Sequence, residues 1–220
     1  MANEDRARAI IESHYKQNDP LGWFEALYST AKGDVSQIPW ADQKPNHNLT
    51  SWLDRERTAG ANRSAMVVGC GLGDDAEELV RRGFVVSAFD IAQSAIDWCG
   101  KRFPSSLVKF SQADLLRLPA DWIGAFEFVF EAYTIQALPR SIRPQAIAAV
   151  ASLVAPGGEL LVICRGREAN EDDGSLPWPL THEEMTSFES HGLQRVSFEN
   201  YFDDERDPPI RRFRALFRKG

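Results

Sequence analysis

The residues best suited to chemistry are a glycine-rich segment and three acids that follow apolar runs. Segment 69–73 reads Gly-Cys-Gly-Leu-Gly; it follows a short apolar run and precedes a helix-forming segment, which is the context of a nucleotide-binding loop. Glycines let the backbone turn tightly and approach a ligand closely, and helix amides meet its polar groups. Asp90, Asp114 and Glu131 each end a later apolar run. A tight turn without a ligand also fits the glycines, but acids repeated at strand ends favour a cofactor site.

The charge near the glycine segment separates two cofactor classes. A dinucleotide fold requires a third glycine at position 74, where this chain has Asp74, followed by Asp75. Two carboxylates at the start of a helix would repel the pyrophosphate of NAD or FAD. S-adenosylmethionine carries a positive sulfonium and no phosphate, so it fits these residues better.

The acids after the glycine segment suit the adenosine part of such a cofactor. Asp90 follows Gly69 by 21 residues, near the spacing of about 20 expected for an acid that binds ribose hydroxyls. Asp114 can accept a hydrogen bond from the adenine amino group while Leu115 packs on the ring. We expect both to bind the cofactor.

Alternating strand and helix patterns must position these residues. Apolar runs at 65–68, 84–89, 107–113, 126–130 and 160–164 alternate with helical segments at 75–82, 94–101 and 143–153, the last closed by Gly158. Continuous apolar strands separated by helices indicate a parallel sheet with helices on both faces, which binds ligands at the carboxyl ends of its strands. A helix from Thr181 to Gly192 follows. Alternating strands at 193–202 and 211–217, joined through 203–209, predict an antiparallel pair at the sheet edge.

The first 60 residues have a different character. They contain no strand-like run, and helical segments near Ala7 to His14, Trp23 to Thr30 and from Asn48 are joined by irregular loops. Three of the six Trp residues lie here. We expect a helical N-terminal cap over residues 1–60 and a cofactor-binding domain over 61–220, in a single structural domain overall.

Composition restricts the function. The chain has 220 residues and a net charge of −7, which argues against binding to nucleic acid. The longest apolar run, 147–156, is too short for a membrane span, and the charged N-terminus is unlike a signal peptide, so a cytoplasmic protein that binds no membrane is expected. Three cysteines without a CxxC pair are expected to be reduced thiols. A small-molecule substrate is therefore the favoured partner, and the oligomeric state is left open.

The ordered motifs resemble class I S-adenosylmethionine-dependent methyltransferases. They are the glycine segment after Val67-Val68, Asp90, Gln112-Ala113-Asp114, the strand into Glu131 and Pro156-Gly157-Gly158. The resemblance implies a Rossmann-like α/β fold with a seven-stranded, mostly parallel sheet whose last strand is antiparallel. It covers about residues 60–220. The residues expected at the cofactor are Trp23, Trp40, Gly69, Cys70, Gly71, Gly73, Asp90, Ile91, Asp114, Leu115 and Glu131.

One position departs from that family. Many members have an acid two residues before the first glycine, where this chain has Val67. A carboxylate contact to the methionine amino group must then come from elsewhere. Asp74, Asp75 and a backbone carbonyl of the glycine segment are the alternatives.

The cap is similar to the N-terminal segment of the thiopurine and thiol methyltransferase branch. The likeness rests on Ile38-Pro39-Trp40 before a helix, together with Trp23. It implies that the cap closes over the cofactor and that Trp40 faces the sulfonium through a cation–π contact. An equal alternative is that Trp23, Trp40 and Trp52 are core anchors of the cap.

No catalytic residue is assigned from the sequence. A thiol acceptor, with a pKa of roughly 8.5, needs little help to ionise, whereas a phenol or amine makes other demands on a base. A zinc site is not expected, since His182-Glu183-Glu184-Met185-Thr186 lacks the second histidine of HExxH. The basic cluster at 211–219 alternates with apolar residues and predicts a solvated sheet face. The candidates near the acceptor are Tyr15, His14, His47, Tyr133, Gln136 and Arg165.

The sequence therefore predicts methyl transfer from S-adenosylmethionine to a small molecule, with a thiol sulfur as the favoured acceptor. A small-molecule O-methyltransferase, a non-catalytic S-adenosylmethionine-binding module and a protein or RNA methyltransferase are the alternatives.

Overall fold

The structure is a computed structural model that describes residues 2–172, 174, 176–203 and 207–220. The chain forms two compact units. Unit 1 comprises the chain up to Ala61 together with Gly69–Asp114, and unit 2 comprises Asn62–Val68 and Leu115–Gly220. The division at residue 60 stays a prediction. No helix among the described residues is long and apolar enough to span a membrane.

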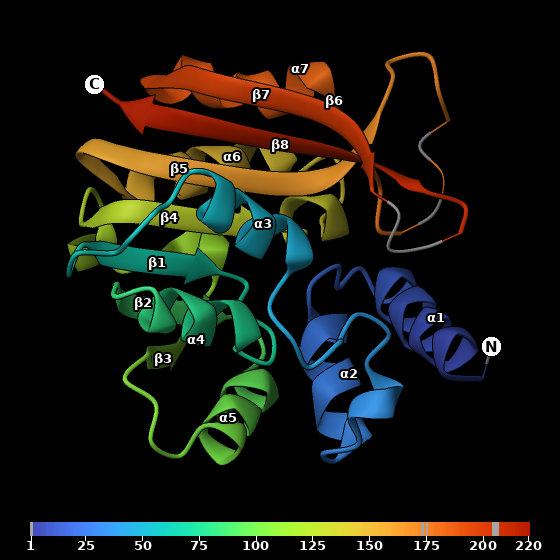
Figure 1. The fold of residues 1–220 in the computed structure, drawn as a ribbon. Helices are drawn as coiled ribbons and strands as arrows, with labels where there is room; N and C mark the ends of the chain where they lie inside the picture. The colour runs from blue at the N-terminus through green and yellow to red at the C-terminus, as the bar shows by residue number, and fades with distance from the viewer. Residues whose placement is uncertain (1, 173, 175, 204–206) are drawn as a thin grey trace. The chain divides into compact units, whose positions relative to one another are not determined.

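Helices occur in both units and carry the labels of Figure 1. In unit 1 they are α1 (Ala2–Lys16), α2 (Gly22–Ala31), η1 (Val35–Gln37), α3 (His47–Arg55), α4 (Asp74–Arg81) and α5 (Gln93–Arg102). In unit 2 they are η2 (Leu115–Arg117), η3 (Ala120–Trp122), η4 (Ile135–Ala137), α6 (Arg143–Leu153), α7 (His182–Thr186) and η5 (Ser187–His191).

The strands form a mixed sheet in the order β3-β2-β1-β4-β5-β8-β7. The last strand, β8, is antiparallel to both β5 and β7, whereas β1 pairs parallel with β4 and β2 with β3. The predicted Rossmann-like fold with a seven-stranded sheet and a reversed last strand is confirmed. The strands are β1 (Ser64–Val68), β2 (Val85–Asp90), β3 (Lys109–Gln112), β4 (Phe126–Ala132), β5 (Val154–Arg167), β6 (Leu180–Thr181), β7 (Leu193–Asp203) and β8 (Ile210–Lys219).

The strand order places a topological switch point between β1 and β4. From β1 the order continues through β2 and β3 on one side and through β4 and β5 on the other. Ligands of open α/β sheets bind beyond the carboxyl ends of the strands at such a point. In register, Val68 at the end of β1 pairs with Glu131 in β4.

Most predicted elements agree with the structure within one to three residues, but the first helix and the fifth strand begin five and six residues earlier than predicted, and the predicted end of the helix before that strand is wrong. Helix α6 ends at Leu153, and Gly158 lies inside β5 rather than closing the helix. Val154 already has extended backbone angles and pairs with Phe126, followed by an irregularity in the ladder. The glycines at 157–158 therefore form part of this irregular strand. The predicted connection 203–209 includes residues 204–206, which lie outside the described residues.

The centre of unit 2 is a sheet region buried on both faces. Phe128, Val129 and Phe130 in β4 are at most 1% exposed. A strand segment without a solvent face favours β-branched and aromatic side chains at every position, which is why residues 128–130 are all apolar. Helix α6 packs against β4 and β5 (Figure 1).

Unit 1 joins the N-terminal helices to the elements around the glycine segment. Helix α2 packs against α1 and α5 (Figure 1). A shared apolar cluster contains residues from the N-terminal helices and from the glycine segment and α5. Its buried members are Ala7, Leu27, Tyr28, Ala31, Ile38, Leu72, Ala92, Ala95 and Trp98.

Candidate functional site

The glycine segment adopts a conformation that its sequence permits. Gly69, Gly71 and Gly73 have φ values of +61°, +52° and +88°, in the left-handed region that glycine tolerates best. A Cβ atom at Gly73 would lie 2.9 Å from the Phe110 ring. The segment therefore needs glycine both for its backbone angles and for the space that a side chain would fill.

Asp90 holds the glycine segment against the end of β2. Its Oδ2 accepts a hydrogen bond from the Gly71 amide at 2.9 Å, and its Oδ1 accepts one from Ala92 at 2.9 Å. The side chain is buried, and burial raises the pKa of this carboxyl above its usual value. A carboxylate has about four acceptor positions, so Asp90 can accept from the predicted ribose hydroxyls as well as from the backbone.

The end of β3 meets the end of β2 beside Asp90. The Ala113 amide donates to the Asp90 carbonyl at 3.0 Å, and the Gln112 side chain donates to the Ile91 carbonyl at 3.1 Å. Asp114, the next residue, is half-buried. Unit 1 thus brings together the glycine segment and the predicted adenosine acids Asp90 and Asp114. Leu115, predicted to pack on the adenine ring, begins η2 and is 7% exposed.

The two acids at the start of α4 already have protein partners. Asp74 forms a bidentate ion pair with Arg102, at 2.7 and 2.8 Å. Asp75 Oδ1 accepts a hydrogen bond from the Asn46 amide at 2.6 Å, and burial raises the pKa of Asp75 to about 7. These contacts fix the glycine segment to α5 and the N-terminal segment to α4.

Two thiols also lie at the glycine segment. The Cys99 thiol of α5 donates to the Gly71 carbonyl at 3.3 Å. A hydrogen bond with Cys99, together with burial, raises the pKa of Cys70 well above its usual value. A thiol with a raised pKa is a weak nucleophile. We therefore expect Cys70 to contact the cofactor through its backbone and not through its thiol.

Aromatic residues of the N-terminal segment lie against the glycine segment. Trp40 Nε1 donates to the Tyr28 hydroxyl at 3.0 Å. A Cβ atom at Gly71 would lie 3.1 Å from that hydroxyl, so Tyr28 packs directly on the glycine. Trp23 contacts Trp40 edge to face, with ring centroids 6.0 Å apart. Trp40 is 43% exposed whereas Trp23 is 1% exposed, so of the two predicted cofactor residues Trp40 offers the accessible ring.

The sequence analysis did not identify Tyr28 as a residue of the site, although the apolar pattern around it indicates the buried side of a helix. Trp23, Leu27 and Ala31 recur at four-residue spacing on the buried side of α2, and Tyr28 adjoins this apolar stripe. Burial, with the negative charge of Asp90, raises the pKa of Tyr28 well above its usual value. Tyr28 therefore remains a neutral hydroxyl that accepts from Trp40.

The three N-terminal acceptor candidates lie in different places. His14 Nδ1 lies 3.0 Å from Asp19 Oδ2, and His14 lines a groove of about 390 Å³ between α1 and α2. His47 is exposed at the start of α3. Tyr15 lies near the end of α1 and is half-buried. None of these observations assigns a catalytic role to the three residues.

Unit 2 carries the remaining polar candidates at the end of β4. Glu131 is fully buried, and its Oε1 accepts hydrogen bonds from Thr134 at 2.8 Å and Ile135 at 3.0 Å. Its Oε2 is buried without a hydrogen-bond partner in the part of the chain that the structure describes. Burial raises the pKa of Glu131 to about 7.

Tyr133 follows β4 in an unusual backbone conformation. Its φ is +65°, which is uncommon for a bulky residue. The Arg212 guanidinium lies 5.0 Å from the centre of its ring, and Arg212 forms a buried ion pair with Asp203. Arg214 is buried as well and pairs with Glu199 at 2.7 Å. The expectation of a solvated basic face is wrong for these two arginines, since each has an acidic partner and packs on an aromatic ring.

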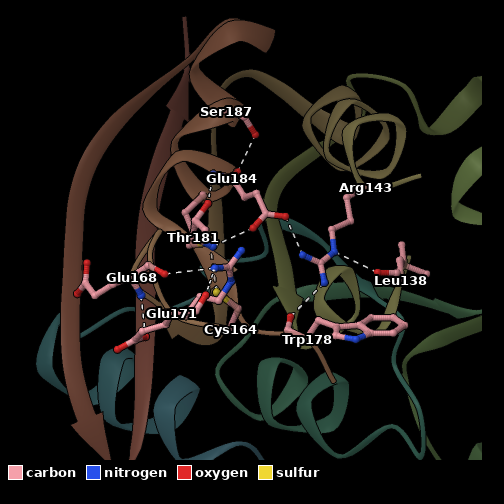
Figure 2. A network of polar contacts seen from close by, with 11 residues as sticks. Leu138, Arg143, Cys164, Glu168, Glu171, Trp178, Thr181, Glu184 and Ser187 are labelled. Carbon is pink, nitrogen blue, oxygen red and sulfur yellow. Dashed lines mark hydrogen bonds and ion pairs between the residues drawn. The ribbon is translucent and has the colours of Figure 1, made fainter. Parts of the chain in front are cut away.

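Gln136 and Arg165 contact each other. The Gln136 side-chain oxygen accepts a hydrogen bond from the Arg165 amide at 2.6 Å, and its backbone oxygen accepts one from the Trp178 amide at 2.9 Å. Figure 2 shows how Arg143 holds this segment: its guanidinium donates to Glu184 at 2.7 Å and to the Trp178 carbonyl at 3.1 Å. This buried arginine, which the sequence did not indicate, positions the chain after β5 that carries Trp178.

Comparisons with known proteins agree with this arrangement. The model of the family described as thiopurine S-methyltransferase (TPMT) matches residues 31–213. No curated protein sequence gives a significant match.

Several solved structures share the fold at low sequence identity. One is described as “Conversion of a Disulfide Bond into a Thioacetal Group during Echinomycin Biosynthesis”. It has 16% sequence identity to this chain and a TM-score of 0.73, and the match covers 90% of this chain and 91% of that chain. The [4+2]-cyclase SpnF has 18% identity and a TM-score of 0.71, covering 91% and 95%. The N-methyltransferase NodS from Bradyrhizobium japonicum WM9, in complex with S-adenosyl-L-homocysteine, has 18% identity and a TM-score of 0.66, covering 88% and 98%.

Proposed function

The chain belongs to the thiopurine S-methyltransferase family of class I S-adenosylmethionine-dependent methyltransferases, and we propose that its methyl acceptor is the sulfur of a small-molecule thiol. The observation that carries the proposal is the extent of the family match. It begins at residue 31, within the N-terminal segment, and ends at residue 213 in the last strand. The family description names sulfur as the atom that receives the methyl group.

The residues of unit 1 fit the cofactor chemically. S-adenosylmethionine supplies a methyl group on a positively charged sulfur. The left-handed glycine segment adjoins Asp90, and the acceptor capacity of the Asp90 carboxylate suits the ribose hydroxyls. The exposed ring of Trp40 suits the sulfonium, because an aromatic face attracts a cation. We assign cofactor contacts to Trp23, Trp40, Gly69, Cys70, Gly71, Gly73, Asp90, Ile91, Asp114, Leu115 and Glu131.

Methyl transfer is a displacement at carbon, so the protein contributes mainly by aligning the acceptor and excluding water. A thiol suits this chain because its pKa of roughly 8.5 leaves some thiolate near neutral pH without a strong base. Tyr133 directly follows β4, and Arg165 lies in the neighbouring strand β5; both are proposed to contact the acceptor. A guanidinium at such a position would favour an acceptor with a negative charge.

An oxygen acceptor is the second candidate. The buried carboxyl of Glu131, with a pKa raised to about 7, is suited to accept a proton from a hydroxyl near neutral pH. A binding module without chemistry is a third candidate, because the cyclase SpnF shares the fold and the fold alone does not decide the reaction. A protein or RNA acceptor is the fourth.

The first experiment measures cofactor binding by calorimetry with S-adenosylmethionine and S-adenosylhomocysteine. A folded sample that binds neither would remove the basis of the proposal. The second measures release of S-adenosylhomocysteine with aromatic and aliphatic thiols, and with the phenols and amines of the same ring skeletons as matched controls. We expect turnover with thiols at least tenfold above that with phenols. Turnover restricted to phenols, amines or a macromolecule would overturn the choice of sulfur.

A further inference from the structure

The groove of about 390 Å³ between α1 and α2 lies within unit 1, and none of the residues that line it is assigned to the cofactor. We call it the α1/α2 groove (Figure 1). Small-molecule sites have volumes of roughly 300–1,000 Å³, so a small ligand fits a space of this size. From α2 it is lined by Ala26 and Thr30, one turn apart. From α1 it is lined by Arg6, Ala9, Ile10, Ser13 and His14, whose spacing of three and four residues places them on one face.

Small side chains leave this groove open and give it an apolar lining. Ala9 on α1 and Ala26 on α2 carry only a methyl group each, so they do not fill the space between the helices. Ile10 lines the groove too, and it packs against the buried apolar cluster of unit 1. A short hydrocarbon chain laid on these residues would be removed from water, which favours its binding.

Arg6 brings a positive charge without an acidic partner to the α1/α2 groove. Its Nη2 donates a hydrogen bond to Thr30 Oγ1 at 2.5 Å, which joins α1 to α2. Its Nη1 is buried and has no hydrogen-bond partner in the part of the chain that the structure describes. Leaving a buried donor without a partner costs stability, and a bound acceptor would remove that cost.

The other charged groups near the groove do not neutralise Arg6. The pKa of Asp34 is lowered mainly by hydrogen bonds from Gln37 and Ser36 and, to a smaller extent, by the charge of Arg6. Its carboxylate accepts those hydrogen bonds, and it forms no ion pair with Arg6 among the described residues. His14, two turns further along α1, already has its own acidic partner. The charge complementary to the groove is therefore negative.

We propose that the α1/α2 groove binds a small-molecule carboxylate that carries a short hydrocarbon chain. The carboxylate accepts hydrogen bonds from Arg6, and the chain lies on Ala9, Ile10 and Ala26. Arg6 is only partly buried and has several rotatable bonds, so a small turn of its guanidinium brings Nη1 to the ligand. A carboxylate matches one guanidinium in charge and geometry, whereas a phosphate dianion would need a second cation.

Three probes with the same six-carbon chain test what the groove recognises. They are hexanoate, hexan-1-ol and hexylammonium, titrated into the full chain near neutral pH without cofactor and followed by NMR chemical shifts. We expect hexanoate to bind at least about tenfold more tightly than hexanol, since a hydrogen bond to a charged group is the stronger kind, and hexylammonium not to bind. Octanoate should bind more tightly than hexanoate, by about two- to fourfold for each added methylene.

Two variants locate the charge. Arg6→Gln removes the guanidinium from the groove, and Arg8→Gln is the matched control because Arg8 is an exposed arginine of the same helix that does not line the groove. We expect Arg6→Gln to weaken hexanoate binding by about tenfold or more and hexanol binding by less than about twofold. Arg8→Gln should change both by less than about twofold. Circular dichroism and thermal unfolding establish that each variant is folded.

A third variant fills the groove and leaves its charge in place. Ala9 is exposed, so Ala9→Leu adds apolar volume without disturbing the core, and leucine suits a helix nearly as well as alanine. We expect it to weaken the binding of hexanoate and of hexanol by about tenfold or more, because the larger side chain occupies the place of the hydrocarbon chain.

The results that overturn the inference are distinct. Hexanoate that does not bind, or binds no more tightly than hexanol, would show that the groove does not select a carboxylate. Equal losses in Arg6→Gln and Arg8→Gln would show a response to the overall charge of α1. Unchanged hexanoate binding in Ala9→Leu would place the ligand elsewhere. Because no cofactor is present, these results are independent of the proposed methyl transfer.

Discussion

The buried carboxyl of Glu131 makes the stability of the empty protein depend on pH. Burial raises its pKa from the ordinary value of 4.5 to about 7, against the effect of two amide hydrogen bonds. The folded state therefore holds the proton more tightly than the unfolded chain does. This favours folding below about pH 4.5, and the advantage is lost as the pH rises through about 7. At about 1.4 kcal/mol per unit of pKa, the difference amounts to about 3 to 4 kcal/mol.

The Glu131→Gln variant does not titrate at this position. We expect it to match the wild type within about 1 kcal/mol at pH 5, where the native carboxyl is protonated and neutral like the amide. At pH 8 the variant should be more stable by up to about 3 kcal/mol, because the wild type then buries a carboxylate without a cation beside it.

Urea unfolding of the two proteins at pH 5, 6, 7 and 8, without cofactor, measures the difference. Asp75 also has a pKa raised to about 7 and shifts stability in the same direction, but it contributes equally to both proteins and cancels. Asp121→Asn, which removes one carboxylate from an exposed position of unit 2, should show no such trend. A difference between Glu131→Gln and the wild type that stays constant from pH 5 to pH 8 would refute the assignment of a buried, neutral carboxyl.

Three further changes test unit 1. Gly71→Ala should destabilise by roughly 1–2 kcal/mol from its left-handed backbone alone, and by more from the Cβ placed 3.1 Å from the Tyr28 hydroxyl. Gly33 also has a left-handed backbone, but a Cβ atom there would have no other atom within 4 Å, so Gly33→Ala is the control. If the two variants lost the same stability in thermal unfolding, the close packing of Tyr28 on Gly71 would be contradicted. Glu25→Ala removes the carboxylate that accepts a hydrogen bond from the Ser94 amide at the start of α5, and it should lower the stability by about 0.5–2 kcal/mol. We also expect faster hydrogen exchange in α2. Unchanged exchange would show that this contact does not hold α2 against α5. Asp90→Ala should weaken S-adenosylhomocysteine binding by about 1–3 kcal/mol in calorimetry, and an unaltered affinity would show that this acid does not support the site.

The parallel core could be predicted because its strands have a simple signal. Strands buried on both faces are continuously apolar, and the glycine segment and the acids mark their carboxyl ends. The boundary at Gly158 failed because a glycine after a helical pattern is read as a helix end. Here the pairing of Val154 with Phe126 overrides that local preference and extends the strand.

Partners of charged residues could not be predicted because they depend on distant segments. Arg212 and Arg214 follow an alternating pattern that is typical of a solvated strand face. Their burial requires Asp203 and Glu199 on β7, and sequence alone does not give that register. The same holds for Tyr28, whose contact with Gly71 joins residues 43 positions apart.

The shared packing of the N-terminal helices and α5 bears on how the chain reaches its folded state during synthesis. Glu25 hydrogen-bonds Ser94, 69 residues later, and Tyr28 packs on the ring of Trp98 with centroids 6.5 Å apart. The apolar face of α2 emerges from the ribosome first, but the helix that buries it follows only after a further 60 to 70 residues. At about 5–20 residues per second, Leu27 and Tyr28 wait several seconds in the nascent chain before α5 can pack on them. This interval is when the aromatic N-terminal segment would be open to aggregation or to capture by a chaperone.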